Sequence, residues 1–274
     1  MHNPAHLCAA IGGSINAEAG GGSASGWYLP AARARTHRHG HWMMTLNPDS
    51  DKTRPGSGIP PLPIPSATVV IARDGARGIE VLGAVRSRNL SFARGALVFP
   101  GGALDPGDAL LAARHGAVAD PLAVYRIAAI RELFEETGVL LAEGETALAA
   151  SVLAGLRSEL QAGHRDFAAL LADHGLRPAL HALAHFAHWI TPMTFAKRFS
   201  THFFLAEAPP HQVPRHDGHE LVEAFWMAPK DLVAWHREGR YKVMLPTLQS
   251  CRRLMVFATV AAARDGLGME YHPA

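Results

Sequence analysis

The 274-residue chain is 48% hydrophobic and 18% charged, so it has the apolar content to fill the core of a globular domain. Its 26 basic and 24 acidic side chains leave a net charge of +2 and form no lysine-rich block, which argues against a nucleic-acid or membrane surface. With only two cysteines, and no apolar run of the roughly 18 residues that a membrane span needs, the composition excludes a disulfide framework and predicts a cytoplasmic protein.

The first 65 residues have no sustained hydrophobic period. A Gly/Ser/Ala stretch leads into "RARTHRHGH" and then into the proline-rich "RPGSGIPPLPIP", so we expect residues 1–65 to form a disordered tail. From residue 66 the pattern changes to short β-branched runs at 67–73, 79–87 and 96–99, separated by glycine-containing turns. These runs predict the first strands of a folded domain that covers residues 66–274.

A helix with clear start and stop signals is expected after a short alanine-rich helical segment near 108–115. Asp120 suits the N-cap, Pro121 the first helical position and Gly138 the C-terminal end, which predicts a helix over about 121–137. Alternating Ala/Leu runs and polar faces then predict a helical insertion at about 145–186.

The last third of the chain returns to strand composition and closes with helices. We expect strands at 187–193, 197–207 and 220–227, and helices near 229–238 and 246–264. Strands flanked by helices without a regular βαβ alternation predict a mixed sheet sandwiched between helical layers, an α/β or α+β fold.

The helix over 121–137 carries an unusual cluster of acids in "RELFEETG". Glu132, Glu135 and Glu136 share a helix side, and two unit charges about 4 Å apart repel by roughly 4 kcal/mol at an effective dielectric near 20. Arg131 can offset one of these charges, and a hard divalent ion such as Mg²⁺ or Mn²⁺ can offset the others. A solvated acidic helix end with an ordinary Arg131–Glu135 pair is the alternative.

Two segments taken together indicate a function more specifically than the acidic helix does alone. "FPGGALDPGD" followed by "RELFEETGV" resembles the Nudix box, G-x5-E-x7-R-E-U-x-E-E-x-G-U, in which U is aliphatic. The positions that match in kind are Gly102, Arg131, Glu132, Leu133, Glu135, Glu136, Gly138 and Val139.

The box departs from that pattern in two places. Asp108 stands where a glutamate is expected, and 22 residues (109–130) rather than seven separate it from Arg131. An interrupted box of this kind is similar to the branch of acyl-coenzyme A diphosphatases, and the likeness extends over roughly residues 66–265. Upstream, "VRSRNLSFARGALVFPGG" is similar to the coenzyme A signature of related Nudix hydrolases.

The resemblance implies a Nudix-like mixed sheet and a metal-dependent hydrolase of coenzyme A or acyl-coenzyme A, which yields 3′,5′-ADP and (acyl) phosphopantetheine. It implies that Glu132, Glu135 and Glu136 hold Mg²⁺ or Mn²⁺, and that Arg131 orients Glu135 or its neighbour. A further glutamate outside the box acts as ligand or base in many relatives. Glu220 is the best-placed match here, with Glu223 as the alternative.

Four further residues are candidates for contacts with the substrate: Arg86, Arg94, Gly101 and Gly102. Guanidinium groups suit bidentate phosphate contacts, and a Gly-Gly loop lets backbone N–H groups approach a phosphate closely. The partner that the resemblance implies is a small nucleotide, and a homodimer stays open. Two other functions also stay open: hydrolysis of another nucleoside diphosphate derivative such as NADH or ADP-ribose, and nucleotide binding without catalysis. His181, His185 and His188 are a weaker metal candidate, because no carboxylate lies nearby in the sequence.

Overall fold

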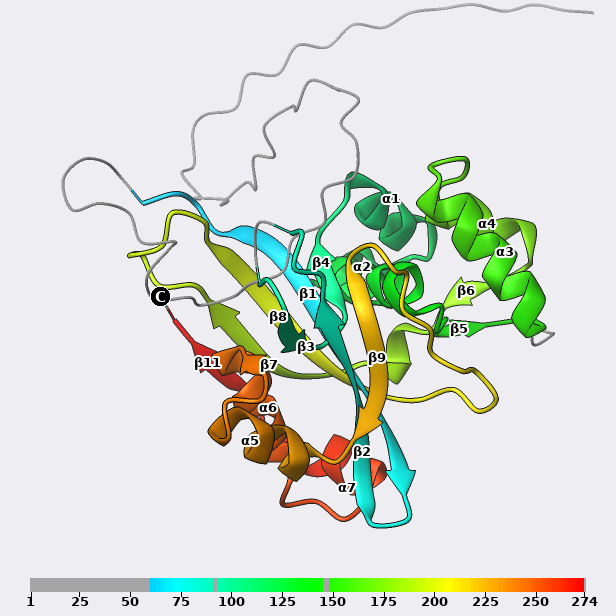
Figure 1. The fold of residues 1–274 in the computed structure, drawn as a ribbon. Coiled ribbons are helices and arrows are strands. Elements are labelled where there is room, and N and C mark those ends of the chain that lie inside the picture. Colours follow the sequence, from blue (N-terminus) through cyan, green and yellow to red (C-terminus); the bar gives the residue numbers. More distant parts are fainter. Residues whose placement is uncertain (1–59, 91–92, 145–147, 274) are drawn as a thin grey trace, which may run out of the picture. The chain divides into compact units, whose positions relative to one another are not determined.

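The computed structural model of the protein describes residues 60–90, 93–144 and 148–273 (Figure 1). Most of the predicted disordered tail, residues 1–59, lies outside this described part of the chain. The first strand begins at Ile64, two residues before the expected start of the domain.

A mixed β-sheet forms the centre of the domain. Its main path runs in the order β10-β3-β2-β1-β8-β7-β11, while β4 pairs with β1 and β9 pairs with β2. Strands β1 and β8 are parallel, whereas β1–β2, β2–β9 and β7–β8 are antiparallel. The strands are β1 (Ile64–Gly75), β2 (Gly78–Arg86), β3 (Ala96–Val98), β4 (Gly101–Ala103), β7 (Ala184–Ile190), β8 (Phe199–Glu207), β9 (Leu221–Met227), β10 (Lys242–Val243) and β11 (Glu270–His272).

Helices cover both faces of this sheet (Figure 1). On one face α2 (Ala123–Thr137) packs against the sheet, and α1 (Pro106–Arg114), α3 (Ala150–Gln161) and α4 (Phe167–Asp173) pack beyond it in the same core cluster. The other face is covered by α5 (Pro229–Arg237), α6 (Leu245–Leu254) and α7 (Val260–Gly266). The period of two along β1 divides its side chains between the two cores: Val69 and Ile71 face α2, while Val70 and Ala72 face α6. This arrangement confirms the predicted mixed sheet between helical layers.

The helix that carries the acidic cluster, α2, begins two residues later than the sequence predicts. Asp120 is not its N-cap, because the Asp120 carboxylate accepts the N–H of Leu122 at 2.9 Å and pairs with Arg126. The C-terminal end agrees with the prediction: Gly138 has φ 73° and donates its N–H to the carbonyl of Phe134 at 2.8 Å.

Several other boundaries differ from the sequence prediction, among them the strand expected at 187–193, which lies at Ala184–Ile190. The single helix expected over 246–264 is two helices, α6 and α7, because the hydroxyl of Thr259 accepts the N–H of Ala262 and so starts a new helix. The helical insertion ends before 186, since β7 already begins at Ala184; a short pair of strands, β5 (Ala142–Glu143) and β6 (Arg177–Pro178), brackets α3 and α4. No helix in the described part of the chain has the length and apolar character to cross a membrane.

Candidate active site

Two glycines of β4 bring the sheet into close contact with the acidic helix α2. The N–H of Gly101 donates to Glu136 Oε2 at 3.1 Å. A Cβ added to Gly102 would lie 2.3 Å from Glu132 Oε1, and one added to Gly101 would lie 2.3 Å from the carbonyl oxygen of Ala67. Neither position accepts a side chain without displacing its neighbour. The Gly-Gly pair is therefore required for β4 to lie directly against the carboxylates.

Arg131 joins α1 to the acidic cluster. Its guanidinium makes two hydrogen bonds to the carboxylate of Asp108, at 2.9 and 3.0 Å, and a third at 3.0 Å to the carbonyl of Ala103. Nη1 donates to Glu132 at 2.9 Å and lies 3.5 Å from a carboxylate oxygen of Glu135. Burial disfavours the charged guanidinium, but these neighbouring carboxylates outweigh it and raise the pKa of Arg131 well above its usual value.

Asp108 is thus a structural partner within the site, which the sequence had left undecided. Its side chain is 2% exposed and also accepts the N–H of Asp105 at 2.8 Å, which closes a capping box at the start of α1. Burial raises the pKa of the Asp108 carboxyl, and the contact with Arg131 opposes that shift. The segment 109–130 that interrupts the box folds as the rest of α1, a 3₁₀ turn and the start of α2, and it leaves this pair intact.

A second arginine, Arg86, lies at the end of β2 between two glutamates from distant parts of the chain. Its guanidinium lies 3.8 Å from Glu136 and 3.6 Å from Glu220, and the side chain is only 1% exposed. Burial, and then the charge of Glu132, raise the pKa of the Glu136 carboxyl well above its usual value. Glu136 Oε1 is buried and accepts no hydrogen bond from the described residues.

Glu220 reaches this site from the turn just before β9. The carboxylate of Asp217 accepts the N–H groups of Glu220 and Leu221 at 2.9 and 2.7 Å, and the carbonyl of Glu220 accepts the N–H of Ser87 at 2.8 Å. Glu223, the alternative from the sequence, lies within β9 and is exposed. Of these two glutamates, the fold brings Glu220 to the acidic cluster.

Most of the predicted site residues meet in one place, and one does not. The group that meets consists of Arg86, Gly101, Gly102, Arg131, Glu132, Glu135, Glu136 and Glu220. Arg94 lies apart: its side chain is exposed and donates to the carbonyl of Leu90 at 2.7 Å. Arg86 belongs to the group, but it faces carboxylates and is shielded from solvent.

The carboxylates fit a hard divalent cation in chemical kind. Oxygen ligands of this type suit Mg²⁺ or Mn²⁺, and the buried Oε1 of Glu136 is an acceptor that such an ion would satisfy. Over residues 60–90, 93–144 and 148–273, however, no three acidic, histidine or cysteine side chains converge so as to hold one ion in their present rotamers. Glu132 and Glu135 instead face Arg131, with oxygens 2.9 and 3.5 Å from its Nη1.

The three histidines of the other metal candidate contact residues outside that set, Glu143 and His202. Exposed His181 contacts Glu143 at 2.8 Å, whereas His185 Nε2 lies 3.0 Å from Nδ1 of His202. The ring of His188 stacks on His202 with centroids 4.0 Å apart. Burial, followed by the charges of His188 and His185, lowers the pKa of His202 to about 3. Only the pairing of β7 with β8 brings His202 into this cluster, so no local pattern in the sequence points to it.

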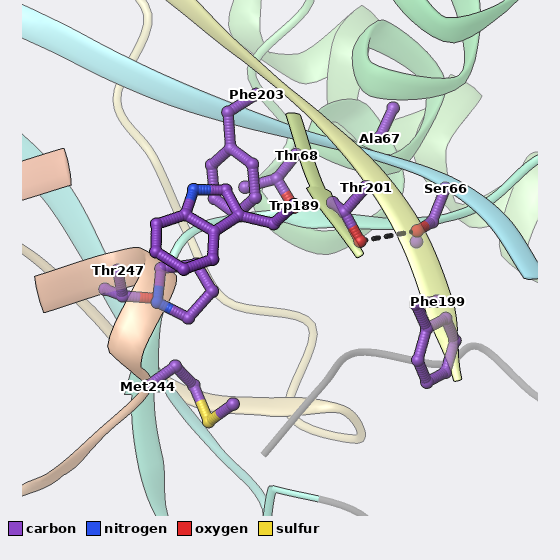
Figure 2. Close-up of a pocket in the computed structure, with 11 residues that line it drawn as sticks. Ser66, Ala67, Thr68, Trp189, Phe199, Thr201, Phe203, Met244 and Thr247 are labelled. Carbon is purple, nitrogen blue, oxygen red and sulfur yellow. Dashed lines mark hydrogen bonds between the residues drawn. The ribbon is translucent and has the colours of Figure 1, made fainter. Parts of the chain in front are cut away.

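Gly102 also borders a small hollow on the sheet (Figure 2). The indole of Trp189 and the ring of Phe203 line this hollow, and nearby the hydroxyls of Ser66 and Thr201 are hydrogen-bonded at 2.8 Å. Its volume of about 30 Å³ is far below the roughly 300–1,000 Å³ of small-molecule sites, so this hollow is too small to be one.

Comparison with known proteins identifies the class to which this fold and site belong. The family model described as the NUDT19 Nudix domain matches residues 111–254. A NUDIX hydrolase structure from Alicyclobacillus acidocaldarius is 31% identical and superimposes with a TM-score of 0.68, over 76% of this chain and 97% of that one. The chain therefore belongs to the Nudix hydrolase family.

Curated relatives give a more particular likeness. The human protein named acyl-coenzyme A diphosphatase NUDT19 is 27% identical over 261 residues, which cover 76% of this chain and 67% of the relative. Nudix hydrolase 7 of Caenorhabditis elegans is 28% identical over 195 residues, which cover 69% of this chain and 59% of the relative. The chain thus spans about three fifths to two thirds of the lengths of these two relatives.

Proposed function

We propose that the protein hydrolyses the diphosphate bond of coenzyme A or acyl-coenzyme A and releases 3′,5′-ADP and (acyl) phosphopantetheine. One observation carries the proposal: the buried Glu136 carboxyl, with its raised pKa and an oxygen that accepts no hydrogen bond from the described residues, lies against the Gly101 N–H and beside Glu132. Such a cluster is costly unless a cation joins it.

The reaction adds one water molecule across the phosphoanhydride. The water oxygen bonds to one phosphorus, and the bridging oxygen leaves with the other phosphate. In this proposal Glu132, Glu135 and Glu136 hold Mg²⁺ or Mn²⁺, which when bound supplies Lewis-acid polarisation of the diphosphate. Glu220 accepts the proton of the attacking water, because it comes from outside α2 and its side chain is 19% exposed beside buried Arg86.

The two arginines act on the carboxylates. Arg131 fixes Glu132 by a hydrogen bond and faces Glu135, while its two bonds to Asp108 keep it from swinging away. Arg86 lies between Glu136 and Glu220 and holds these two acids at one site. Both arginines are thus positioning groups that reduce the repulsion between carboxylates before the substrate arrives.

The names of the relatives favour the coenzyme A class over other nucleotides. The relatives NUDT19 of human and of chicken are named acyl-coenzyme A diphosphatases. A nucleotide-binding protein without catalysis is the alternative that Asp108 and the insertion in the box would motivate. The structure weighs against it, because the segment 109–130 folds without disturbing the bidentate contact between Asp108 and Arg131.

A substrate panel with product mass analysis tests the proposal. Wild type should cleave coenzyme A or its acyl esters with Mg²⁺ or Mn²⁺, lose activity with a chelator and regain it when the ion is restored. Glu135→Gln should lower kcat by at least 100-fold, whereas Glu207→Gln, an exposed glutamate at the end of β8, should match wild type. Cleavage of NADH or ADP-ribose in place of coenzyme A contradicts the substrate class, and nucleotide binding without any turnover contradicts the proposed activity.

A further inference from the structure

The helical insertion supplies two side chains to the end of the acidic helix. From α3, Arg157 Nε and Gln161 Nε2 both donate to the carbonyl of Glu135, at 2.9 and 2.7 Å. That carbonyl belongs to the last turn of α2, where a helix leaves its carbonyl groups without intrahelical partners. The stem of Arg157 packs over the helix terminus, because a Cβ added to Gly138 would lie 3.6 Å from its Cδ. One donor is enough to satisfy the carbonyl, so capping alone does not explain the second side chain.

Arg157 also reaches the segment of the chain that leads to β9. Its Nη1 donates to the carbonyl of Arg215 at 2.8 Å. Two residues further on, the carboxylate of Asp217 accepts the N–H of Glu220 at 2.9 Å. One planar guanidinium therefore contacts both the turn of α2 that carries Glu135 and the segment that leads to Glu220.

The charge of Arg157 acts on the same two segments. Burial lowers the pKa of its guanidinium, while the carboxylates of Asp217 and Glu136 oppose that shift. The cation thus attracts one acid from each segment. Its Nη2 is buried and has no hydrogen-bond partner among the residues that the structure describes, which is unfavourable for stability. The neutral amide of Gln161 caps the same carbonyl without burying a charge, so an arginine is not needed for a purely local cap.

We propose that Arg157 is a positioning residue for the hydrolysis, which holds the carboxylates of α2 and the Glu220 carboxylate at a fixed separation. It acts through backbone carbonyl groups and touches none of the reacting atoms. Arg86 joins the same two segments at the carboxylates of Glu136 and Glu220, and Arg157 joins them at the backbone. This inference rests on the proposed function.

Binding of Mn²⁺ to the full chain, followed by electron paramagnetic resonance, tests the inference without substrate. Arg157→Lys keeps the positive charge but loses the two separated donors of the guanidinium, and Arg157→Gln loses both features. Each variant should bind Mn²⁺ at least fivefold more weakly than wild type. At saturating Mn²⁺, each should lower kcat for coenzyme A at least tenfold and leave KM within twofold. The control is Arg165→Gln, which removes an arginine of the same insertion that pairs with Glu159 and Asp173, and it should match wild type.

The direction of the change in Mn²⁺ affinity separates positioning from a simple effect of charge. Removing a cation near Glu136 without moving the carboxylates would tighten Mn²⁺ binding, so a tighter or unchanged affinity in Arg157→Gln overturns the inference. Wild-type kcat and Mn²⁺ affinity in Arg157→Lys also overturn it, even if the melting temperature falls. Failure of both variants to fold, as judged by circular dichroism, makes Arg157 a structural residue only. If wild type binds Mn²⁺ but hydrolyses no coenzyme A compound, the proposed function fails, while the Mn²⁺ titration still decides the role of Arg157.

Discussion

Replacing Asp108 by asparagine tests whether the Asp108–Arg131 pair is what holds the site together. The substitution keeps the size of the side chain but removes its charge and one of its two acceptor oxygens. Arg131 then keeps its bonds to Ala103 and Glu132, but one nitrogen loses its partner on a side chain that is only 9% exposed. The single oxygen of the new amide also has to be shared with the N–H of Asp105.

The expected cost follows from the burial of both partners. Removing one member of a buried ion pair costs about 3–5 kcal/mol. Glu132 and Glu135 still neutralise part of the arginine charge, so we expect the lower end, about 3 kcal/mol. This is a substantial part of the roughly 5–15 kcal/mol that stabilises a typical domain.

Urea unfolding followed by circular dichroism measures this cost, and a double-mutant cycle assigns it to the pair. Asp108→Asn and Arg131→Gln should each destabilise the fold, and the double variant should cost less than the sum by at least about 1 kcal/mol, because both changes break the same contact. Strictly additive losses, or a loss below about 0.5 kcal/mol for Asp108→Asn, would refute the role of the pair.

Three further substitutions address other parts of the molecule. Gly102→Ala should displace the carboxylate of Glu132, destabilise the fold by about 1–3 kcal/mol and lower kcat at least tenfold. The control is Gly155→Ala, whose added Cβ has nothing near it. Equal effects of the two substitutions would contradict the close contact between Gly102 and Glu132. Glu136→Gln resembles the protonated acid that the fold favours, so the melting temperature at pH 8 should be maintained or raised while turnover is lost; a marked fall in melting temperature contradicts the raised pKa. His202 has a folded pKa of about 3, below the value near 6.5 in an unfolded chain, so the unfolded state binds more protons between these limits and stability falls as pH drops from 6.5. Because the side chain is partly exposed, we expect His202→Gln to reduce that fall by only about 1 kcal/mol, and an unchanged pH profile in chemical unfolding contradicts the shift.

The elements that the sequence predicts well are those with a strong local pattern. The β-branched runs that became β1 and β2 are bounded by glycine turns, and the end of α2 is marked by Gly138, so no distant contact is needed to recognise them. Strand β4 was missed because Gly101 and Gly102 have the composition of a loop, and only pairing with β1 makes them a strand. Likewise, the break between α6 and α7 depends on Thr259 acting as a cap, which competes with an otherwise helical pattern.

The residues of the candidate site also fall into those that a local pattern predicts and those that only the fold brings together. Spacing along one helix is enough to gather Glu132, Glu135 and Glu136, but the pairing of Arg86 with Glu220 joins the end of β2 to a turn more than 130 residues away. Asp108 did carry a local signal, since an acid three residues after Asp105 completes a capping box. The capping box accounts for Asp108 as part of a helix cap but does not predict its contact with Arg131. That contact forms only when α1 packs against α2.

The insertion between β5 and β6 contributes to the site through the end of α2. A helix leaves its last carbonyl groups without intrahelical partners. Here Arg157 and Gln161 of α3 donate to the carbonyl of Glu135 at 2.9 and 2.7 Å, and the N–H of Arg215 donates to that of Thr137. The turn that carries Glu135 and Glu136 is therefore fixed on one side by Gly101 and on the other by α3.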